Sequence, residues 1–459
     1  MASIVERGNT YSVVYYAPVN GESKQVWESF ETRAEAKRRK AEVENETYEG
    51  TLIAPSKLTI KAYLVDFVSL YGEENWSLST YSSNIALIDN YINPLIGDHS
   101  LQAFNTKSAD TYLKQLRKTQ AVETQFRKRR DELIGPSVVG NIFKLLRCAF
   151  GQAVRWELIK KNPFEFVSKP KHTYQKRAIW TADTIKAALD ACRDSKLYVA
   201  MNLSFACSLR IGEISGLTWD NVFITDEHIA DDNAYVLVEK ELQRASLKAI
   251  EQLDKKDVIY LFPAFKPNAK TRLVLKTPKT ESSVRKVWLP KTLAYILREY
   301  KKSQDAMKSA LQDEYFDHNL VVCLPNGRPC EERLISKSFQ ELREKCRLPR
   351  VVFHSLRHSS TTYKLKLNRG DIKATQGDTG HAQADMVTSV YAHILDEDRK
   401  VNATKMEAAF YAGFANPDLR DVRPPTDPSG MEVQALLTKL QNASPEALAA
   451  LASFFKEVG

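Results

Sequence analysis

Four short motifs in the second half of the chain carry side chains that could act on a phosphodiester. They are 207–217 with Arg210, 277–280 with Lys279, 354–358 with His354 and Arg357, and 380–391 with His381 and Tyr391. Two guanidiniums can hold the oxygens of a phosphate bidentately and stay charged at any relevant pH. A tyrosine phenol can form a covalent link to the phosphorus. The combination predicts cleavage and rejoining of a phosphodiester by nucleophilic attack.

The chemistry suggests a role for most members of this set. Arg210 and Arg357 are expected to neutralise the charge that builds on the phosphorus oxygens during attack. Tyr391 is the predicted nucleophile, and His354 is the candidate that takes its proton, since a free phenol has a pKa of about 10. Glu213 follows Arg210 by three residues, so both can lie on one helical face, where the carboxylate would orient the guanidinium.

The order of these motifs resembles that of the tyrosine recombinase family, in which Arg, Lys, His-x-x-Arg, Gly-His and Tyr follow one another. The resemblance covers about residues 178–400 and is weaker over 4–165, where it rests on domain order. It implies that Lys279, on a β-hairpin, is the general acid for the leaving 5′-hydroxyl. It also implies that His381 donates a hydrogen bond to a phosphate oxygen. Asp378-Thr379 precede the Gly-His pair where the family usually has apolar residues, a departure that bears on local packing.

Other residues near the motifs leave alternatives open. Lys276 and Lys286 lie close enough to Lys279 in sequence to be alternative general acids. His358 and His393 are interpreted as structural. No carboxylate or cysteine accompanies the histidines at the spacing of metal ligands, so no metal or other cofactor is expected. ATP is not expected either, because a covalent tyrosyl intermediate conserves the energy of the phosphodiester.

Charge is unevenly distributed along the 459 residues, whose formal net charge is +9. Residues 57–177 hold 19 Lys and Arg against 11 Asp and Glu, whereas residues 401–459 hold 5 against 7. Excess positive charge in one region is typical of proteins that bind nucleic acid. Nucleic acid is therefore a candidate partner, which the family resemblance specifies as double-stranded DNA, and the tail is not expected to bind it.

Two basic runs are candidates for contact with the DNA backbone. They comprise Lys37, Arg38, Arg39 and Lys40, and Arg127, Lys128, Arg129 and Arg130. Neutralising phosphates supplies affinity but little sequence choice. A solvated charged surface is the alternative interpretation for both runs.

The predicted organisation is multidomain, with a mixed α+β catalytic domain of tyrosine recombinase type as its largest part. Its predicted parts are an arm-binding-like α+β module (1–52), an all-α core-binding domain (53–167), a basic linker (168–180), the catalytic domain (181–412), and a Pro-rich linker with a helical tail (413–459) that could serve oligomerisation. Residues 244–268 are interpreted as an insertion of unassigned structure.

Several local patterns predict individual elements. Asn20-Gly21 indicates a hairpin turn, and Thr32 with Glu35 has the spacing of a helix capping box. Asn93-Pro94, followed by Gly97, is expected to break a helix. The apolar stripe over 138–153 predicts another helix. Thr181 is expected to cap the first helix of the catalytic domain, and strands are expected at 235–238, 271–275 and 284–289.

Cysteine usage and hydropathy bear on location. Six scattered cysteines without Cys-x-x-Cys spacing are typical of reduced thiols. The first residues lack the apolar core of a signal peptide, and no apolar run is long enough to span a bilayer. A cytoplasmic protein is therefore expected, and the family resemblance implies association with the nucleoid and a bacterial or phage origin.

The resemblance implies a site-specific integrase of a mobile element. Such an enzyme would integrate and excise DNA through a 3′-phosphotyrosyl intermediate and a Holliday junction, as a homotetramer on paired attachment sites. An excisionase and a host DNA-bending protein are candidate partners. Alternatives are a type IB topoisomerase-like enzyme, a chromosome-resolving recombinase and a non-enzymatic DNA-binding protein. The intact motif set argues against the last, and the N-terminal module favours the integrase over the resolving recombinase.

Overall fold

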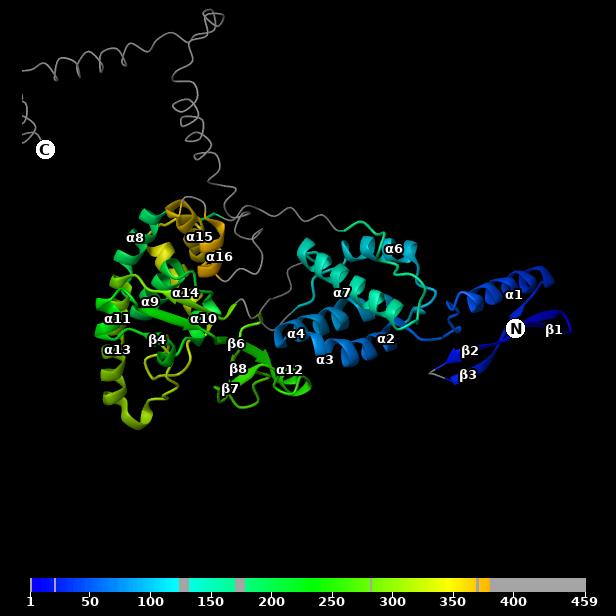
Figure 1. The fold of residues 1–459 in the computed structure, drawn as a ribbon, viewed down its shortest axis with the longest axis horizontal. Coiled ribbons are helices and arrows are strands. Elements are labelled where there is room, and N and C mark those ends of the chain that lie inside the picture. Colours follow the sequence, from blue (N-terminus) through cyan, green and yellow to red (C-terminus); the bar gives the residue numbers. More distant parts are fainter. Residues whose placement is uncertain are drawn as a thin grey trace, which may run out of the picture. The chain divides into compact units, whose positions relative to one another are not determined.

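The computed structural model describes residues 2–19, 22–123, 132–169, 178–280, 283–368 and 371–379. Within these ranges, separate hydrophobic cores form in the N-terminal, helical and C-terminal stretches of the chain. The ribbon in Figure 1 follows them in blue, cyan and green to orange. Several predictions lie outside the described residues: the Asn20-Gly21 turn, the basic run 127–130, most of the 168–180 linker, His381, Tyr391, and the tail 413–459.

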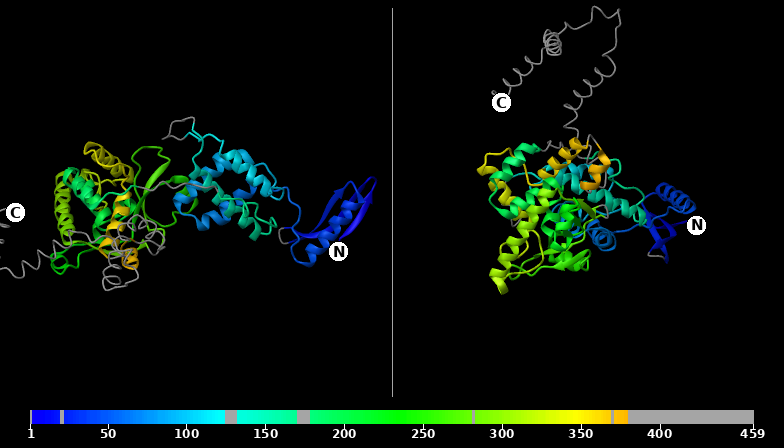
Figure 2. Two further views of the ribbon diagram at one scale, coloured as in Figure 1. Left: turned by 90° about the horizontal axis from the view of Figure 1, so that it is seen from above. Right: turned by 60° about the vertical axis from the view of Figure 1, so that its left-hand side comes forward.

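The N-terminal stretch is a three-stranded antiparallel sheet covered on one face by a helix (Figures 1 and 2). It comprises β1 (Ser3–Arg7), β2 (Thr10–Val19), β3 (Glu22–Phe30) and α1 (Arg33–Tyr48). Alternate residues of β2, including Val13 and Tyr15, pack against Ala36 of α1 because side chains alternate between the faces of a strand. The capping box at Thr32 is confirmed. Strand β1 was not predicted.

The second stretch is helical, as expected. It comprises α2 (Ile60–Asp66), α3 (Glu73–Asn75), α4 (Leu78–Leu87), α5 (Asn93–Ile96), α6 (Thr106–Leu116) and α7 (Pro136–Arg155), with π-helical turns η1 (Phe67–Gly72) and η2 (Ile88–Ile92). The predicted stripe on α7 is confirmed, since Ile142, Leu146 and Ala149 are buried.

The predicted break is wrong at Asn93-Pro94, where the helical backbone continues from α4 through η2 into α5, and is confirmed at Gly97, which caps the end of α5. A proline within a helix normally clashes with the carbonyl four residues earlier. Here the N–H of Asn93 donates to the carbonyl of Ile88, five residues back, which is the pattern of a π turn. The wider turn leaves room for the ring of Pro94, and the helix ends before Gly97.

The C-terminal stretch surrounds a small sheet with helices. The antiparallel sheet has the order β4-β5-β9, formed by β4 (Val222–Phe223), β5 (Tyr235–Val238) and β9 (Arg285–Trp288). The helices are α8 (Ala182–Ala191), α9 (Ser195–Ala206), α10 (Ile211–Gly216), η3 (Trp219–Asn221), α11 (Asp226–Ala230), α13 (Lys291–Leu311), η5 (Gln312–Glu314), α14 (Glu332–Lys345), α15 (Ser355–Leu367) and α16 (Ile372–Thr379).

This core begins slightly before the expected boundary at residue 181. Thr181 caps α8 as its side chain accepts from the N–H of Thr184. Trp180, placed by the sequence in the linker, is only 3% exposed, and its indole N–H donates to the carbonyl of Pro349. The ordered core therefore includes the last residue of the predicted linker.

The segment that the sequence left unassigned, 244–268, belongs to a second three-stranded sheet with the order β6-β8-β7. It contains the second half of β6 (Glu241–Ser246), α12 (Leu247–Gln252) and β7 (Val258–Leu261). Strands β6 and β7 both pair with β8 (Thr271–Lys276). Ala249 and Ile250 of α12 are buried in the core of the helical stretch. The hydroxyls of Ser82 on α4 and Ser246 lie 3.0 Å apart. The insertion thus packs against α4.

A close backbone approach joins α10 to this second sheet. A Cβ atom on Gly216, the last residue of α10, would lie 2.6 Å from the backbone N of Leu242 and 2.7 Å from the carbonyl carbon of Glu241. Only glycine leaves room for the two backbones to come this close. Among the described residues, no helix is both long and apolar enough to cross a membrane.

Candidate active site

Arg210 lies at the start of α10, immediately after a tight connection from α9. Its side chain is 33% exposed, whereas that of Glu213 is 1% exposed. The backbone N–H of Arg210 donates to Glu213 Oε2 at 2.9 Å, and the guanidinium donates to Oε1 at 2.5 Å. One carboxylate therefore fixes both the backbone and the side chain of Arg210, in the relation that their three-residue spacing suggested.

Glu213 also binds a second arginine, from strand β9. Arg285 donates to Oε1 at 3.2 Å and to Oε2 at 2.9 Å, and both side chains are buried. Burial raises the pKa of the Glu213 carboxyl, but the hydrogen bonds and charge of Arg285, followed by those of Arg210, outweigh burial and hold the pKa below its usual value. The carboxylate stays ionised although it is buried.

Arg357 lies on α15 and is 1% exposed. Its guanidinium donates to the backbone carbonyl of Ser208, two residues before Arg210, and at 2.5 Å to the carbonyl of Thr379 at the end of α16. The hydroxyls of Ser208 and Ser360, one turn further along α15, lie 2.6 Å apart. Helix α15 thereby holds the loop that leads into Arg210.

The two arginines are close enough to influence each other's charge. Burial, followed by the positive charge of Arg210, lowers the pKa of the Arg357 guanidinium to about 9. Arg357 therefore remains a cation at neutral pH. Ser208 adopts a positive φ of 53°, an uncommon conformation for a residue with a side chain, which the contacts from α15 stabilise.

His354 lies one residue before α15, three positions before Arg357, and is half-buried. Its ring packs edge-on against that of His358, with centroids 4.9 Å apart. The motif 354–358 thus places an imidazole and a buried guanidinium at the same end of one helix. Among the described residues, no group of three or more His, Cys, Asp or Glu side chains is arranged to hold a metal ion.

The three neighbouring lysines occupy different environments. Lys276 is buried, and its ammonium donates to Glu241 at 3.0 Å and to the carbonyl of Thr277 at 2.7 Å. The ammonium of Lys286 lies 3.7 Å and 3.9 Å from the ring centroids of Tyr235 and Trp288. Both positions are typical of structural cation contacts. Lys279 is exposed, in the segment between β8 and β9.

Comparison with known proteins identifies the family. Residues 179–398 match the model of the phage integrase family. The chain is 24% identical over 288 residues to the ICEBs1 integrase of Bacillus subtilis (strain 168), covering 62% of this chain and 69% of that protein. Residues 179–398 form a tyrosine recombinase domain. The chain is also 20% identical over 398 residues to an integrase of Streptomyces ambofaciens, covering 84% of this recombinase and 89% of that protein.

Solved structures show that the fold is shared. The Tn1549 transposon integrase in complex with transposon right end DNA superposes with a TM-score of 0.57 at 18% identity, over 77% of the recombinase and 99% of that chain. The mixed α+β catalytic fold that the family resemblance implied is thereby confirmed.

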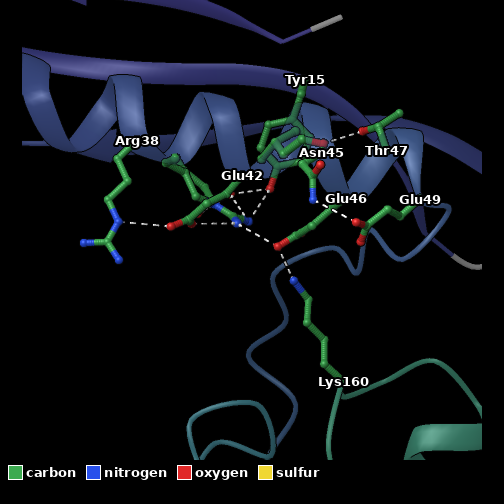
Figure 3. A network of polar contacts seen from close by, with 11 residues as sticks. Tyr15, Arg38, Glu42, Asn45, Glu46, Thr47, Glu49 and Lys160 are labelled. Carbon is green, nitrogen blue, oxygen red and sulfur yellow. Dashed lines mark hydrogen bonds and ion pairs between the residues drawn. The ribbon is translucent and has the colours of Figure 1, made fainter.

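The recombinase uses part of its first basic run for internal contacts. Arg39 forms ion pairs with Glu28 on β3 and with Glu46 of its own helix. Burial lowers the pKa of its guanidinium, but the hydrogen bonds and charge of Glu28 outweigh burial and raise the pKa above its usual value. Arg38 pairs with Glu42 on the next turn (Figure 3), and Lys40 lies 3.7 Å from Glu44. Lys37 is exposed.

Sequence reasoning missed Arg285, Ser208 and Ser360. A signal for Arg285 was present, because the alternation predicted for strand 284–289 places Arg285 on the same face as the apolar Val287. An arginine on an inward face needs a carboxylate partner. No comparable signal marks Ser208 or Ser360, whose contact depends on how α15 packs.

Proposed function

We propose that this recombinase is a site-specific integrase of a mobile element, which cuts and rejoins double-stranded DNA through a covalent link to Tyr391. The observation that most supports the proposal is the pairing of Arg210 and Arg357. These two guanidiniums come from motifs 147 residues apart, and helix α15 and the loop before α10 hold them together. Relatives named as integrases, from Bacillus subtilis and Streptomyces ambofaciens, support the assignment to integration.

The two arginines would bind the scissile phosphate. As Tyr391 attacks phosphorus, negative charge grows on the non-bridging oxygens, and preorganised cations stabilise that charge more than they stabilise the substrate. Glu213 keeps Arg210 oriented before the DNA arrives. Removing either guanidinium should slow cleavage by on the order of 10²–10³-fold.

Proton transfers complete the reaction. His354 takes the proton of the Tyr391 phenol as its oxygen forms the new bond to phosphorus, giving a 3′-phosphotyrosyl linkage. The bond from phosphorus to the 5′-oxygen breaks, and Lys279 donates a proton to that oxygen. The exposed position of Lys279, against the paired or ring-bound ammoniums of Lys276 and Lys286, supports this choice. His381 would donate a hydrogen bond to a phosphate oxygen.

The cycle closes by the same chemistry in reverse. A free 5′-hydroxyl attacks the phosphotyrosyl bond and releases Tyr391, and exchange between two sites passes through a Holliday junction. The scheme includes no ATP, since each bond broken is replaced by one of similar energy, and no metal ion, since Arg210 and Arg357 would stabilise the charge on the phosphate oxygens. A homotetramer on paired attachment sites would carry out both exchanges.

The remaining parts would bind and arrange the DNA. The helical domain at 53–167 holds 15 Lys and Arg against 11 Asp and Glu and would grip the core site, with Arg127, Lys128, Arg129 and Arg130 on the phosphate backbone. The module at 1–52 would bind arm-type sites, where exposed Lys37 is better placed for phosphate contact than Arg39. An excisionase and a host DNA-bending protein would bias the direction of the reaction.

Replacing the nucleophile tests the proposal. The Tyr391→Phe variant should bind an attachment site with unchanged affinity in a gel shift, yet form no covalent adduct with a nicked suicide substrate, because phenylalanine has no oxygen to attack phosphorus. The wild-type protein is the matched control. An adduct that persists in the variant would place the nucleophile elsewhere. Relaxation of supercoiled plasmid without paired sites would instead indicate a topoisomerase.

A further inference from the structure

We infer that Arg285 is a positioning residue that fastens the Lys279 segment to Arg210. The inference rests on the proposed function, because it concerns the delivery of a proton to the leaving 5′-oxygen. No motif of the sequence analysis included Arg285, and it lies six residues after Lys279.

A single buried carboxylate connects Arg285 to Arg210. Glu213 Oε1 accepts from the guanidiniums of Arg210 at 2.5 Å and Arg285 at 3.2 Å. Its Oε2 accepts from the backbone N–H of Arg210 and from the guanidinium of Arg285, both at 2.9 Å. The planar fork of a guanidinium fits two carboxylate oxygens at once, and therefore fixes direction as well as distance. Any displacement of Arg285 changes the oxygens that orient Arg210.

The other end of the connection reaches the residue beside Lys279. Arg285 Nη1, besides contacting Glu213, donates to the carbonyl of Ser283 at 3.0 Å. The N–H of Ser283 donates to the carbonyl of Thr280 at 2.9 Å, and their hydroxyls also lie 2.9 Å apart. Thr280 follows Lys279 directly. Hydrogen bonds therefore run from Arg210 through Glu213, Arg285 and Ser283 to the lysine segment.

Strand β9 gives Arg285 a fixed base. Arg285 pairs with Val238 and Lys286 with Leu237 in the antiparallel register of β5 and β9. On the outer face of the sheet, the ammonium of Lys286 lies between two aromatic rings, whereas Arg285 points into the buried side. Because side chains on both faces of β9 make contacts, the backbone at Arg285 is held in place, and Arg285 can restrain the segment that carries Lys279.

The role predicts a defect that depends on the leaving group. In a substrate with sulfur at the 5′-bridging position, the bond from phosphorus to sulfur breaks and a thiolate leaves. A thiolate needs no proton, because thiols are far more acidic than alcohols. A variant whose fault is a misplaced general acid should therefore recover on this substrate, while a variant whose fault is a lost phosphate contact should not.

The experiment compares covalent adduct formation by the full-length Arg285→Gln variant on an ordinary nicked site and on the same site with the bridging sulfur. We expect a loss of about 100-fold on the ordinary substrate and a loss at least about tenfold smaller on the sulfur substrate. Lys279→Ala should show the strongest recovery, and Arg357→Lys should show none. Arg285→Lys should lie between the wild type and Arg285→Gln, because an ammonium cannot serve both carboxylate oxygens and Ser283 in one plane.

Two features keep the test decisive if Arg285→Gln folds poorly. The ratio of the two rates is measured on one protein preparation, so the folded fraction cancels. The Thr280→Val/Ser283→Ala variant loosens the lysine segment and leaves the Arg285–Glu213 pair intact; it should show the same recovery with a smaller loss.

The outcomes separate this inference from the proposed function. Equal losses of Arg285→Gln on both substrates, or no loss on either, would overturn the role of Arg285 in placing the Lys279 segment while leaving the recombinase reaction in place. A wild-type protein that forms no adduct with either substrate, in a preparation that binds the site, would overturn the proposed function and this inference with it.

Discussion

At the scale of single residues, the site depends on the balance of charge around Glu213. Three cations influence one another here: Arg210 and Arg285 bind the carboxylate directly, and both lower the pKa of nearby Arg357. One buried negative charge allows these cations to stay together in the absence of DNA. The surplus positive charge remains available for the phosphate.

This balance predicts a specific dependence of stability on pH. The pKa of Glu213 is lowered by folding, so its contribution is complete above the unfolded value of about 4.3 and is lost as the pH falls through the lower, folded value. Glu213→Gln should destabilise the catalytic core by about 3–5 kcal/mol at pH 7. The difference from the wild type should shrink as the pH falls below about 4.3.

Hydrogen exchange of peptides from α9 and α10, measured in urea at pH 7 and pH 3.5, reports this difference. The matched control is Glu332→Gln. Burial raises the pKa of the Glu332 carboxyl, so the contribution of Glu332 to stability should increase, not decrease, as the pH falls. If the difference in unfolding free energy between the wild type and Glu213→Gln stays constant with pH, Glu213 is not the ionised carboxylate assigned here.

The sequence could predict contacts between near neighbours at this scale, and fewer of the distant ones. Glu213 beside Arg210 follows from a three-residue spacing, which helical geometry converts into proximity. The pairing of Glu213 with Arg285 joins residues 72 positions apart, and depends on how β9 lies against α10. Which of the three lysines is exposed was likewise decided by strand register and ring packing.

At the scale of elements, the end of α10 determines how closely the second sheet approaches the site. Gly216 lies against the backbone of β6 at a distance that leaves no room for a methyl group. Strand β6 pairs with β8, and β8 leads into the Lys279 segment. The packing of one glycine thus sets the separation between the helix that carries Glu213 and the strand that precedes the proposed general acid.

Gly216→Ala should therefore disturb both stability and catalysis. The added methyl must push β6 away, which should cost about 1–3 kcal/mol, and the rate of covalent adduct formation should fall more than DNA affinity does. Gly140→Ala on α7 is the matched control, because a Cβ there meets nothing within 4 Å and alanine favours a helix. Equal melting temperatures for Gly216→Ala and the wild type would show that β6 can move away from α10 without loss of stability, and would contradict this prediction.

Elements were predicted well wherever local patterns were strong. Strand β5 has the predicted bounds, Tyr235–Val238, and the caps at Thr32 and Thr181 are as expected. The helix through Pro94 was missed because a π turn, which has no clear sequence signature, removes the clash that proline usually causes. The insertion was left unassigned because its strands are short and pair with β8 across the loop.

At the scale of the whole molecule, the chain joins a DNA-cleaving domain to parts that would select and assemble sites. The tail of the chain carries the opposite charge balance from residues 57–177, with 5 Lys and Arg against 7 Asp and Glu over 401–459. An acidic tail is poorly suited to a phosphate backbone. Contact with another protein subunit suits it better.

Deleting 431–459 should accordingly weaken assembly on paired sites more than binding to a single site. Gel shifts on one site should change by less than about threefold, whereas the tetrameric complex on paired sites should lose at least about tenfold in apparent affinity. Sedimentation analysis of the complexes distinguishes the two. Unchanged single-site binding together with unchanged recombination would exclude a role for the tail in assembly.

Because the inserted segment packs into the core of the helical stretch, it is expected to melt with that stretch, although it lies within the catalytic domain in sequence. Ala249, Ile250 and Leu253 of the insertion, and Val274 of β8, share buried surface with the helical stretch. Segments that share a core lose their structure together. Mild heating that melts the helical stretch would therefore release the strand before Lys279 while the α9 core around Arg210 stays folded. Thermal inactivation would then precede collapse of the phosphate-binding pair.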